Sequence, residues 1–391
     1  MYKSVIEANP YVDAIWEVKQ DTNENVVSVW NKFEEEAKYK KENGEFDEIF
    51  LTQVHPGNFQ NYDGTCRSSL FRGYPNPITV PITPIVVLTD TEVNNVKRFV
   101  SKYNLSDKDR VILFECDANS GQSFLTPEFA LETVKIVLKK ESSIKFILSS
   151  NKPIDGDGHN ILDGSELSFR ENAELTKYCE LLIGCSSGIS WLATSDWAKP
   201  LPKIQLLNAK TYMYASMTED ARYFGLPTDN ILEMQSCTPD RLANCILDYL
   251  KDGFPYIREK YHQECKIKFD FYFQQIHYEL LTKNEFLKAA QSINAAFERY
   301  SYSATGTEEL RYIVNNIFSP YLNIFWNNIN DADKNEICKI LHYHPDSGNR
   351  IAIYLHSIAK ILLSMYRSDD IAKRLLRDII LRGLVPKRVK Q

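Results

Sequence analysis

Four small polar residues follow an apolar run in the middle of this chain, and their spacing could bind a phosphate group. The run 180–184 reads ELLIG and predicts a buried strand, and the residues directly after it are Cys185, Ser186, Ser187 and Gly188. Residues 188–197 predict a helix, and a Lys-Pro turn then leads to a strand at 203–207. Open parallel sheets bind ligands beyond the carboxyl ends of their strands, where the amides at a helix start favour phosphate. A plain strand-to-helix turn capped by serine is the alternative interpretation.

A second polar loop lies between a predicted strand at 110–115 and a helix that begins at Thr126-Pro127, with proline in the first turn. Its polar residues could hydrogen-bond a phosphate or a sugar, and they are Ser120, Gly121, Gln122 and Ser123. A solvated loop without a ligand is the alternative interpretation.

The polar stretch 55–76 is too long to be a mere connection and offers groups for an acceptor substrate. His55 follows a predicted strand and is a candidate general base, because histidine titrates near neutrality; the alternative is a surface histidine. Asp63 is the second candidate catalytic residue. Arg67 could bind a phosphate or carboxylate of the acceptor.

Strand and helix patterns alternate from residue 105 to residue 254, which predicts an α/β fold with a parallel sheet covered by helices on both faces. The predicted strands are 110–115, 144–149, 180–184 and 203–207. Before this region we expect a helix over 24–41, with strands at 12–18 and 46–54. From 255 to 391, aromatic and aliphatic residues recur at helical spacing, so this part is expected to be mainly helical.

The segment 180–207, ELLIGCSSGISWLATSDWAKPLPKIQLL, resembles the donor-site motif of heptosyltransferase-like glycosyltransferases with the GT-B fold, of the glycosyltransferase family 9 type. That motif runs roughly DLVIGxDSGxxHLAAALGKPVVxLF. Ser187 and Gly188 fall on the family's Ser/Thr-Gly pair. Ser186 falls on its aspartate and Trp191 on its histidine, so the sugar need not be a heptose. We expect Trp191 to be structural or to stack on a ligand, because indole does not titrate usefully.

Two further stretches agree with the same family in order and spacing. Residues 111–134 resemble its strand, PGAxxxxKxWP loop and PxxFAxL helix, with the family's lysine near Gln122 or Ser123. Residues 5–18 resemble its LLExNPYIDEVIxx segment, which in the family follows a first strand–helix–strand unit. The resemblance therefore implies an incomplete first Rossmann-like domain at 1–104, a Rossmann-like nucleotide-sugar-binding domain at 105–254, and a helical region at 255–391.

The resemblance implies a glycosyltransferase that moves a hexosyl or heptosyl group from a nucleotide-sugar to a glycan or lipid-linked glycan, in cell-surface polysaccharide biosynthesis. It implies no cofactor besides the donor and no metal, since a helix N-terminus supplies positive charge at the diphosphate. The string 155–159, DGDGH, predicts a glycine-rich turn. Two alternatives remain: a non-catalytic GT-B-like nucleotide-binding protein, and another GT-B enzyme such as a nucleotide-sugar epimerase.

The composition limits the number of domains, the kinds of partner and the cellular location that we expect. The 391 residues are 43% hydrophobic and 25% charged, with a net charge of −6, which predicts two or three globular domains and argues against nucleic acid as a partner. The eight cysteines form no CxxC pair, so we expect reduced thiols in a cytoplasmic protein. The N-terminus lacks the apolar core of a signal peptide. The basic amphipathic tail 370–391 is expected either to contact the inner membrane face peripherally or to pack on preceding helices.

Overall fold

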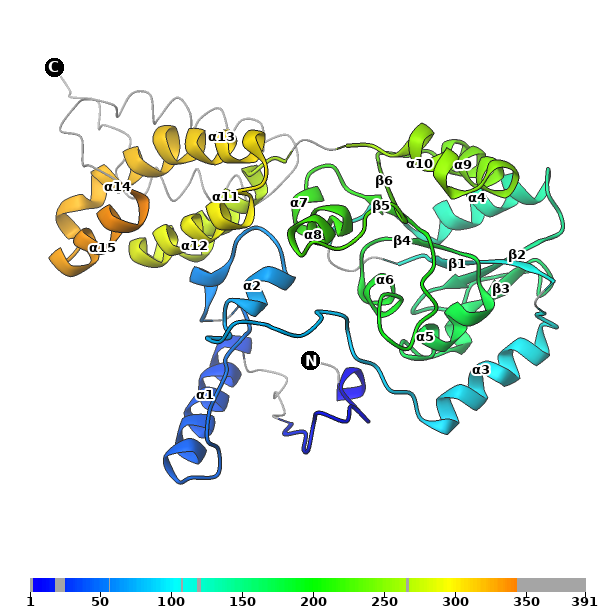
Figure 1. Cartoon of the computed structure of the whole chain (residues 1–391), viewed down its shortest axis with the longest axis horizontal. Helices are drawn as coiled ribbons and strands as arrows, with labels where there is room; N and C mark the ends of the chain where they lie inside the picture. The colour runs from blue at the N-terminus through cyan, green and yellow to red at the C-terminus, as the bar shows by residue number, and fades with distance from the viewer. Residues whose placement is uncertain are drawn as a thin grey trace, which may run out of the picture. The chain divides into compact units, whose positions relative to one another are not determined.

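The computed structural model describes residues 3–17, 25–55, 57–106, 108–117, 121–264 and 267–342. The chain divides into two compact units (Figure 1). The first, called here the sheet unit, comprises residues 1–52, 65–67 and 71–266. The second, called the helical unit, comprises residues 53–64, 68–70 and 267–391.

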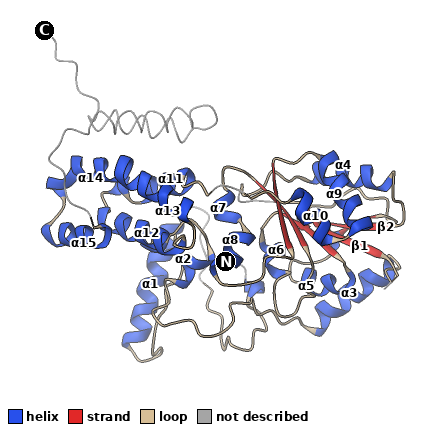
Figure 2. Cartoon of the chain, turned by 45° about the horizontal axis from the view of Figure 1, so that its top comes forward, coloured by secondary structure: helices blue, strands red, loops and turns tan. Residues whose placement is uncertain are grey.

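The sheet unit is built on six parallel strands in the order β3-β2-β1-β4-β5-β6. Figure 2 shows the strands in red. Their bounds are β1 Arg110–Glu115, β2 Ile144–Ser149, β3 Ile161–Asp163, β4 Leu181–Gly184, β5 Lys203–Leu207 and β6 Ile231–Gln235. Chain order reverses direction between β1 and β4, which lie side by side. This is the order of a Rossmann-like sheet, so the α/β prediction with a parallel sheet is confirmed.

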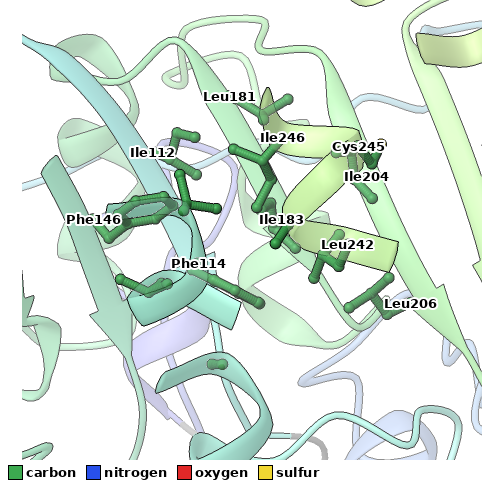
Figure 3. Packing of buried hydrophobic residues seen from close by; sticks show 14 of the residues in the cluster. Ile112, Phe114, Phe146, Leu181, Ile183, Ile204, Leu206, Leu242, Cys245 and Ile246 are labelled. Carbon is green, nitrogen blue, oxygen red and sulfur yellow. The ribbon is translucent and has the colours of Figure 1, made fainter. Parts of the chain in front are cut away.

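Near-continuous apolar runs form these strands because both faces of the sheet are covered. One face packs Ile112, Phe114 and Ile183 against the helices α4, α9 and α10 (Figure 3). The other packs Leu113 and Leu182 against α3 and α5. The helices of the sheet unit are α1 Val26–Glu42, α3 Asp90–Lys102, α4 Pro127–Leu138, α5 Glu171–Leu175, α6 Gly188–Leu192, α7 Tyr212–Ala215, α8 Met217–Tyr223, α9 Pro239–Asp252 and α10 Phe254–Tyr261.

Local sequence signals explain where the longer helices start. Thr126 accepts a hydrogen bond from the backbone N–H of Phe129 and so caps α4, with proline next in the chain. Thr89 and Glu92 form a reciprocal capping box at α3. Helix α6 is shorter than the predicted 188–197 because the chain turns after Leu192.

The two strands predicted near the N-terminus are wrong. Residues 12–17 and 46–54 are irregular, and the part of the chain described before Arg110 contains no strand. Both edges of the sheet, β3 and β6, pair only inward. The apolar run at 49–51 therefore has no partner strand, and Phe50 within it is exposed. The predicted helix at 24–41 is present as α1.

Among residues 267–342, the helical unit contains helices and no strand, as the sequence predicts. Its helices are α11 Asp270–Glu279, α12 Phe286–Arg299, α13 Ala304–Ile313, α14 Ser319–Phe325 and α15 Asp331–Leu341; the short α2, Arg67–Phe71, has residues in both units. Aromatic rings fill the core: Tyr272 stacks on Tyr62 and meets Phe269 edge to face. No helix among the described residues has the length and apolar character needed to cross a membrane. The tail 370–391 lies outside the described residues.

Candidate functional site at the carboxyl edge of the sheet

The carboxyl ends of β1 and β4 mark the place where chain order in the sheet reverses. The loop after β1 leads to α4 on one face, and the loop after β4 leads to α6 on the other face. Loops that leave adjacent strands toward opposite faces open a crevice at this edge, which is where such sheets bind ligands. The two polar loops singled out from the sequence, 121–123 and 185–188, therefore both lie at the switch point.

A buried carboxylate organises this edge. Glu115, the last residue of β1, is 1% exposed and accepts three hydrogen bonds. The backbone N–H of Cys185 donates to it at 3.0 Å, the hydroxyl of Ser190 donates at 2.5 Å, and the hydroxyl of Ser187 donates as well. Three donors satisfy much of the hydrogen-bonding capacity that ionised Glu115 would lose on burial.

Gln205 of β5 extends this cluster. Its side-chain oxygen accepts from the backbone N–H of Ser186 at 2.6 Å and from the Ser190 hydroxyl at 3.2 Å. Ser186 has a left-handed backbone, with φ of 53°, and its hydroxyl donates to the carbonyl of Ala215. A side chain at Gly184 would collide with Ser190 and approach Glu115, so only glycine fits beneath the cluster. We call Glu115, Ser186, Ser187, Ser190 and Gln205 the polar cluster.

The polar cluster changes how the serines can act. In a phosphate site the hydroxyls of Ser186 and Ser187 would face the ligand, but here both donate to groups of the protein itself. A diphosphate would meet the negative charge of Glu115 at the same place. Gly188 lies under the ring of Phe169, which a Cβ atom would approach to 2.6 Å. Packing against Phe169 is therefore sufficient to explain this glycine.

The Cys185 thiol is buried and contacts the carbonyl of Asp117. Burial raises its pKa, and the carboxylate of Glu115 raises it further. Cys185 is therefore a protonated thiol that contributes packing and its backbone N–H to this edge.

The loop after β1 is held to β5 by its own polar groups. Ser123 donates to the carbonyl of Leu206 at 2.5 Å, and the carbonyl of Gln122 accepts from Asn208 at 2.8 Å. Gly121 has φ of 70°, a backbone conformation that favours glycine. Gln122 is buried, and its side-chain oxygen has no hydrogen-bond partner within the described residues. Ser120 lies outside the described residues.

Two other predicted site residues come together away from these loops. The guanidinium of Arg67 lies 4.1 Å from the centre of the Trp191 ring, and its Nη1 is 3.2 Å from a carboxylate oxygen of Asp220. The Trp191 ring thus stacks on a side chain of the protein, which fits a structural role for the indole.

His55 and Asp63, the candidate catalytic residues, belong to the helical unit. The ring of His55 is half-exposed, 3.6 Å from the carboxylate of Glu279. Asp63 is fully buried and accepts hydrogen bonds from the hydroxyls of Ser68 and Ser69 at the start of α2. These contacts give Asp63 a role in holding the local turn.

The glycine-rich string 155–159 forms a turn around Asp157. Its carboxylate accepts from the backbone N–H groups of His159, Asn160 and Ile161, each at 2.8 Å. Within the described residues, no group of three or more His, Cys, Asp or Glu side chains could hold a metal ion.

Sequence reasoning missed Glu115, Ser190 and Gln205, which hold this edge together. The signal was present: strands that are buried on both faces are normally apolar, yet RVILFE ends in glutamate and KIQLL contains glutamine. A charged or amide residue in such a strand needs a buried partner. No family model matches the chain, and a search of curated proteins finds no match either.

Proposed function

We propose that the protein is a glycosyltransferase of GT-B type, and that its sheet unit binds the nucleoside diphosphate of a nucleotide-sugar donor. One observation carries the proposal. Two polar loops chosen from the sequence lie at the switch point of a 3-2-1-4-5-6 parallel sheet, where such folds bind nucleotides. The resemblance of residues 180–207 to a donor-site motif supports the same ligand. The acceptor would be a glycan or a lipid-linked glycan.

The geometry constrains how the donor would be held. The Ser187 hydroxyl and the backbone N–H groups of Cys185 and Ser186 already donate to Glu115 or Gln205. The diphosphate would therefore be bound mainly by backbone N–H groups of residues 121–123, 187 and 188. Gln122 offers a buried side-chain amide at the same edge, which suits a ribose hydroxyl. Backbone donors that point at a leaving diphosphate stabilise the charge that develops during transfer.

Calorimetric titration of the full chain with nucleoside diphosphates of each base, and with their common sugars, tests binding directly. We expect one of them to bind, and Gln122→Ala to weaken that binding roughly tenfold, since a lost hydrogen bond costs about 1.4 kcal/mol. Asn94→Ala on the exposed surface of α3 is the matched control and should leave binding unchanged. Absence of binding by every nucleotide tested would refute the proposal.

A non-catalytic nucleotide-binding protein is the second candidate, and the polar cluster favours it. The Ser187 and Ser190 hydroxyls, which a catalytic site would use to bind phosphate, donate to Glu115 instead. Fewer donors then remain to stabilise the charge on a leaving diphosphate. The two candidates differ in turnover. Release of free nucleoside diphosphate from the bound nucleotide-sugar, with or without an added glycan acceptor, identifies the enzyme; binding without release identifies the non-catalytic protein.

A further inference from the structure

A separate cavity of about 240 Å³, partly open to solvent, is formed by residues of the sheet unit. It is bounded by α8, by the chain after α6, by residues 82–84, and by the starts of β5 and β6. The strand ends that reach it are therefore amino-terminal ends, whereas the switch point is at carboxyl-terminal ends. Its apolar wall includes Trp191, Met217, Leu226 and Ile231.

A buried lysine lines this cavity. Lys203, the first residue of β5, is only 4% exposed, and its ammonium donates a hydrogen bond to the carbonyl of Leu201 at 2.9 Å. No carboxylate of the described residues forms an ion pair with it. Burial lowers the pKa of Lys203 to about 8. A charged amine in this position lacks the compensation that buried charges normally have.

A second buried lysine in the same β-sheet, Lys145, differs from Lys203 in having an acidic partner. Lys145 of β2 is also buried, but its ammonium lies 3.3 Å from the carboxylate of Asp109 and donates to two backbone carbonyls. The sheet unit therefore does supply an acidic partner to one buried lysine. Lys203 is the one whose acidic partner is not found among the described residues.

The other polar groups of the cavity indicate which charge and which hydrogen bond remain unsatisfied. Arg67 and Asp220 are ionised side chains of opposite sign, 3.2 Å apart, so their charges cancel. Ser195 is buried, and its hydroxyl has no hydrogen-bond partner within the described residues. Among the described residues that line it, the cavity thus has one positive charge without an acidic partner, Lys203, and one hydroxyl without a hydrogen-bond partner, Ser195. Thr83, Thr194 and Asn230 also line it, beside the apolar residues.

We propose that this cavity is a binding site for a small monocarboxylate with an apolar body, whose carboxylate pairs with Lys203 and accepts from Ser195. One negative charge neutralises the cavity, and a second would exceed what Lys203 can balance. The volume corresponds to about eight water molecules, at about 30 Å³ each, which suits an aromatic or short aliphatic acid. The apolar walls would cover the rest of such a ligand.

Benzoate and hexanoate are suitable probes, with benzamide and hexanamide as uncharged controls of the same shape. Titration of the full chain by calorimetry should show saturable binding of at least one acid, at least tenfold tighter than its amide. Lys203→Met should weaken acid binding at least tenfold. Lys199→Met removes the same charge from an exposed position outside the cavity wall and should have no effect. The nucleotide titration is independent, so either proposal can fail alone.

Proton uptake gives a readout that does not depend on the stability of a variant. A bound carboxylate favours the charged lysine, so binding at pH 8.5 should take up a proton, measurable by comparing buffers of different ionisation enthalpy. Ala221→Leu, which narrows the cavity without touching the Lys203 charge, should also abolish binding. No binding of either acid by the wild-type chain at about 10 mM, or binding without proton uptake, would overturn the proposal.

Discussion

Buried polar groups are differently hydrogen-bonded at the two ends of β5. At the carboxyl edge, Glu115 at the end of β1, which β4 separates from β5, accepts three hydrogen bonds, and Gln205 of β5 accepts two more. At the amino end, Lys203 donates to a single neutral carbonyl beside a cavity. One end is filled by the protein's own groups, while the other leaves a charge without an acidic partner among the described residues.

The difference indicates at which end of β5 a bound ligand would stabilise the protein. A charge that the chain itself satisfies stabilises the fold, and removing it should be costly. A charge that the chain leaves unsatisfied destabilises the free protein, and removing it should help. The polar cluster therefore predicts structural sensitivity, and the Lys203 cavity predicts ligand dependence. Substitutions at the two ends should change stability in opposite directions.

Glu115→Ala tests the carboxyl end and should have the largest effect. The substitution removes the acceptor of the buried Cys185 amide and of the partly buried Ser187 hydroxyl, and it leaves Ser190 only its longer bond to Gln205. We expect this to cost about 4 kcal/mol of unfolding free energy. Urea denaturation at pH 7 measures this loss. Glu132→Ala on the exposed face of α4 is the matched control and should change stability by no more than about 0.5 kcal/mol. A loss of similar size in both variants would contradict a structural role for Glu115.

The sequence predicted the strands of the sheet better than it predicted the groups that hold them. Apolar runs at 110–115, 144–149 and 203–207 give strands with those bounds, because burial on both faces selects for such runs. The same rule missed β6, whose sequence ILEMQ includes the buried Glu233. It also predicted a strand at 46–54, where no partner strand exists. Pairing is a property of the assembled sheet and cannot be derived from one short run.

The candidate site was located from the sequence, but its internal contacts were not. Glycine and serine after a strand indicate a turn at the sheet's carboxyl edge, and the structure has one there. Which group the Ser187 hydroxyl contacts depends on Glu115, 72 residues earlier in the chain. Such a contact follows from strand order, which local spacing does not encode. For the same reason Lys203, inside KIQLL, carried no visible sign of a cavity.

Lys203→Met tests the amino end and should stabilise the protein by about 2 kcal/mol at pH 7, since methionine fills similar space without a buried charge. The pH dependence has a definite sign. Between the folded pKa of about 8 and the unfolded value of about 10.5, the unfolded chain binds more protons at this lysine, so its contribution to stability rises with pH. Urea denaturation at pH 7 and pH 9.5 should show the gain from the substitution shrinking. A gain that stays constant with pH would contradict burial as its cause.

The smallest expected effect concerns the contact between Arg67 and Trp191. The comparison of the two ends of β5 assumes that the Arg67 charge is held by the protein, beside Asp220, and is not available to a ligand. Arg67 lies against the indole ring, beside Asp220 and 6.0 Å from the centre of the Phe224 ring, so single substitutions would mix several losses. A double-mutant cycle of Arg67→Met with Trp191→Leu isolates the contact. A partly buried cation–π pair should give a coupling of about 1 kcal/mol. Coupling near zero would mean that the ring does not hold the guanidinium, leaving Arg67 able to turn toward an acid in the cavity. In that case Arg67→Met would weaken benzoate binding as much as Lys203→Met does, whereas a fixed Arg67 predicts a weaker effect than that of Lys203.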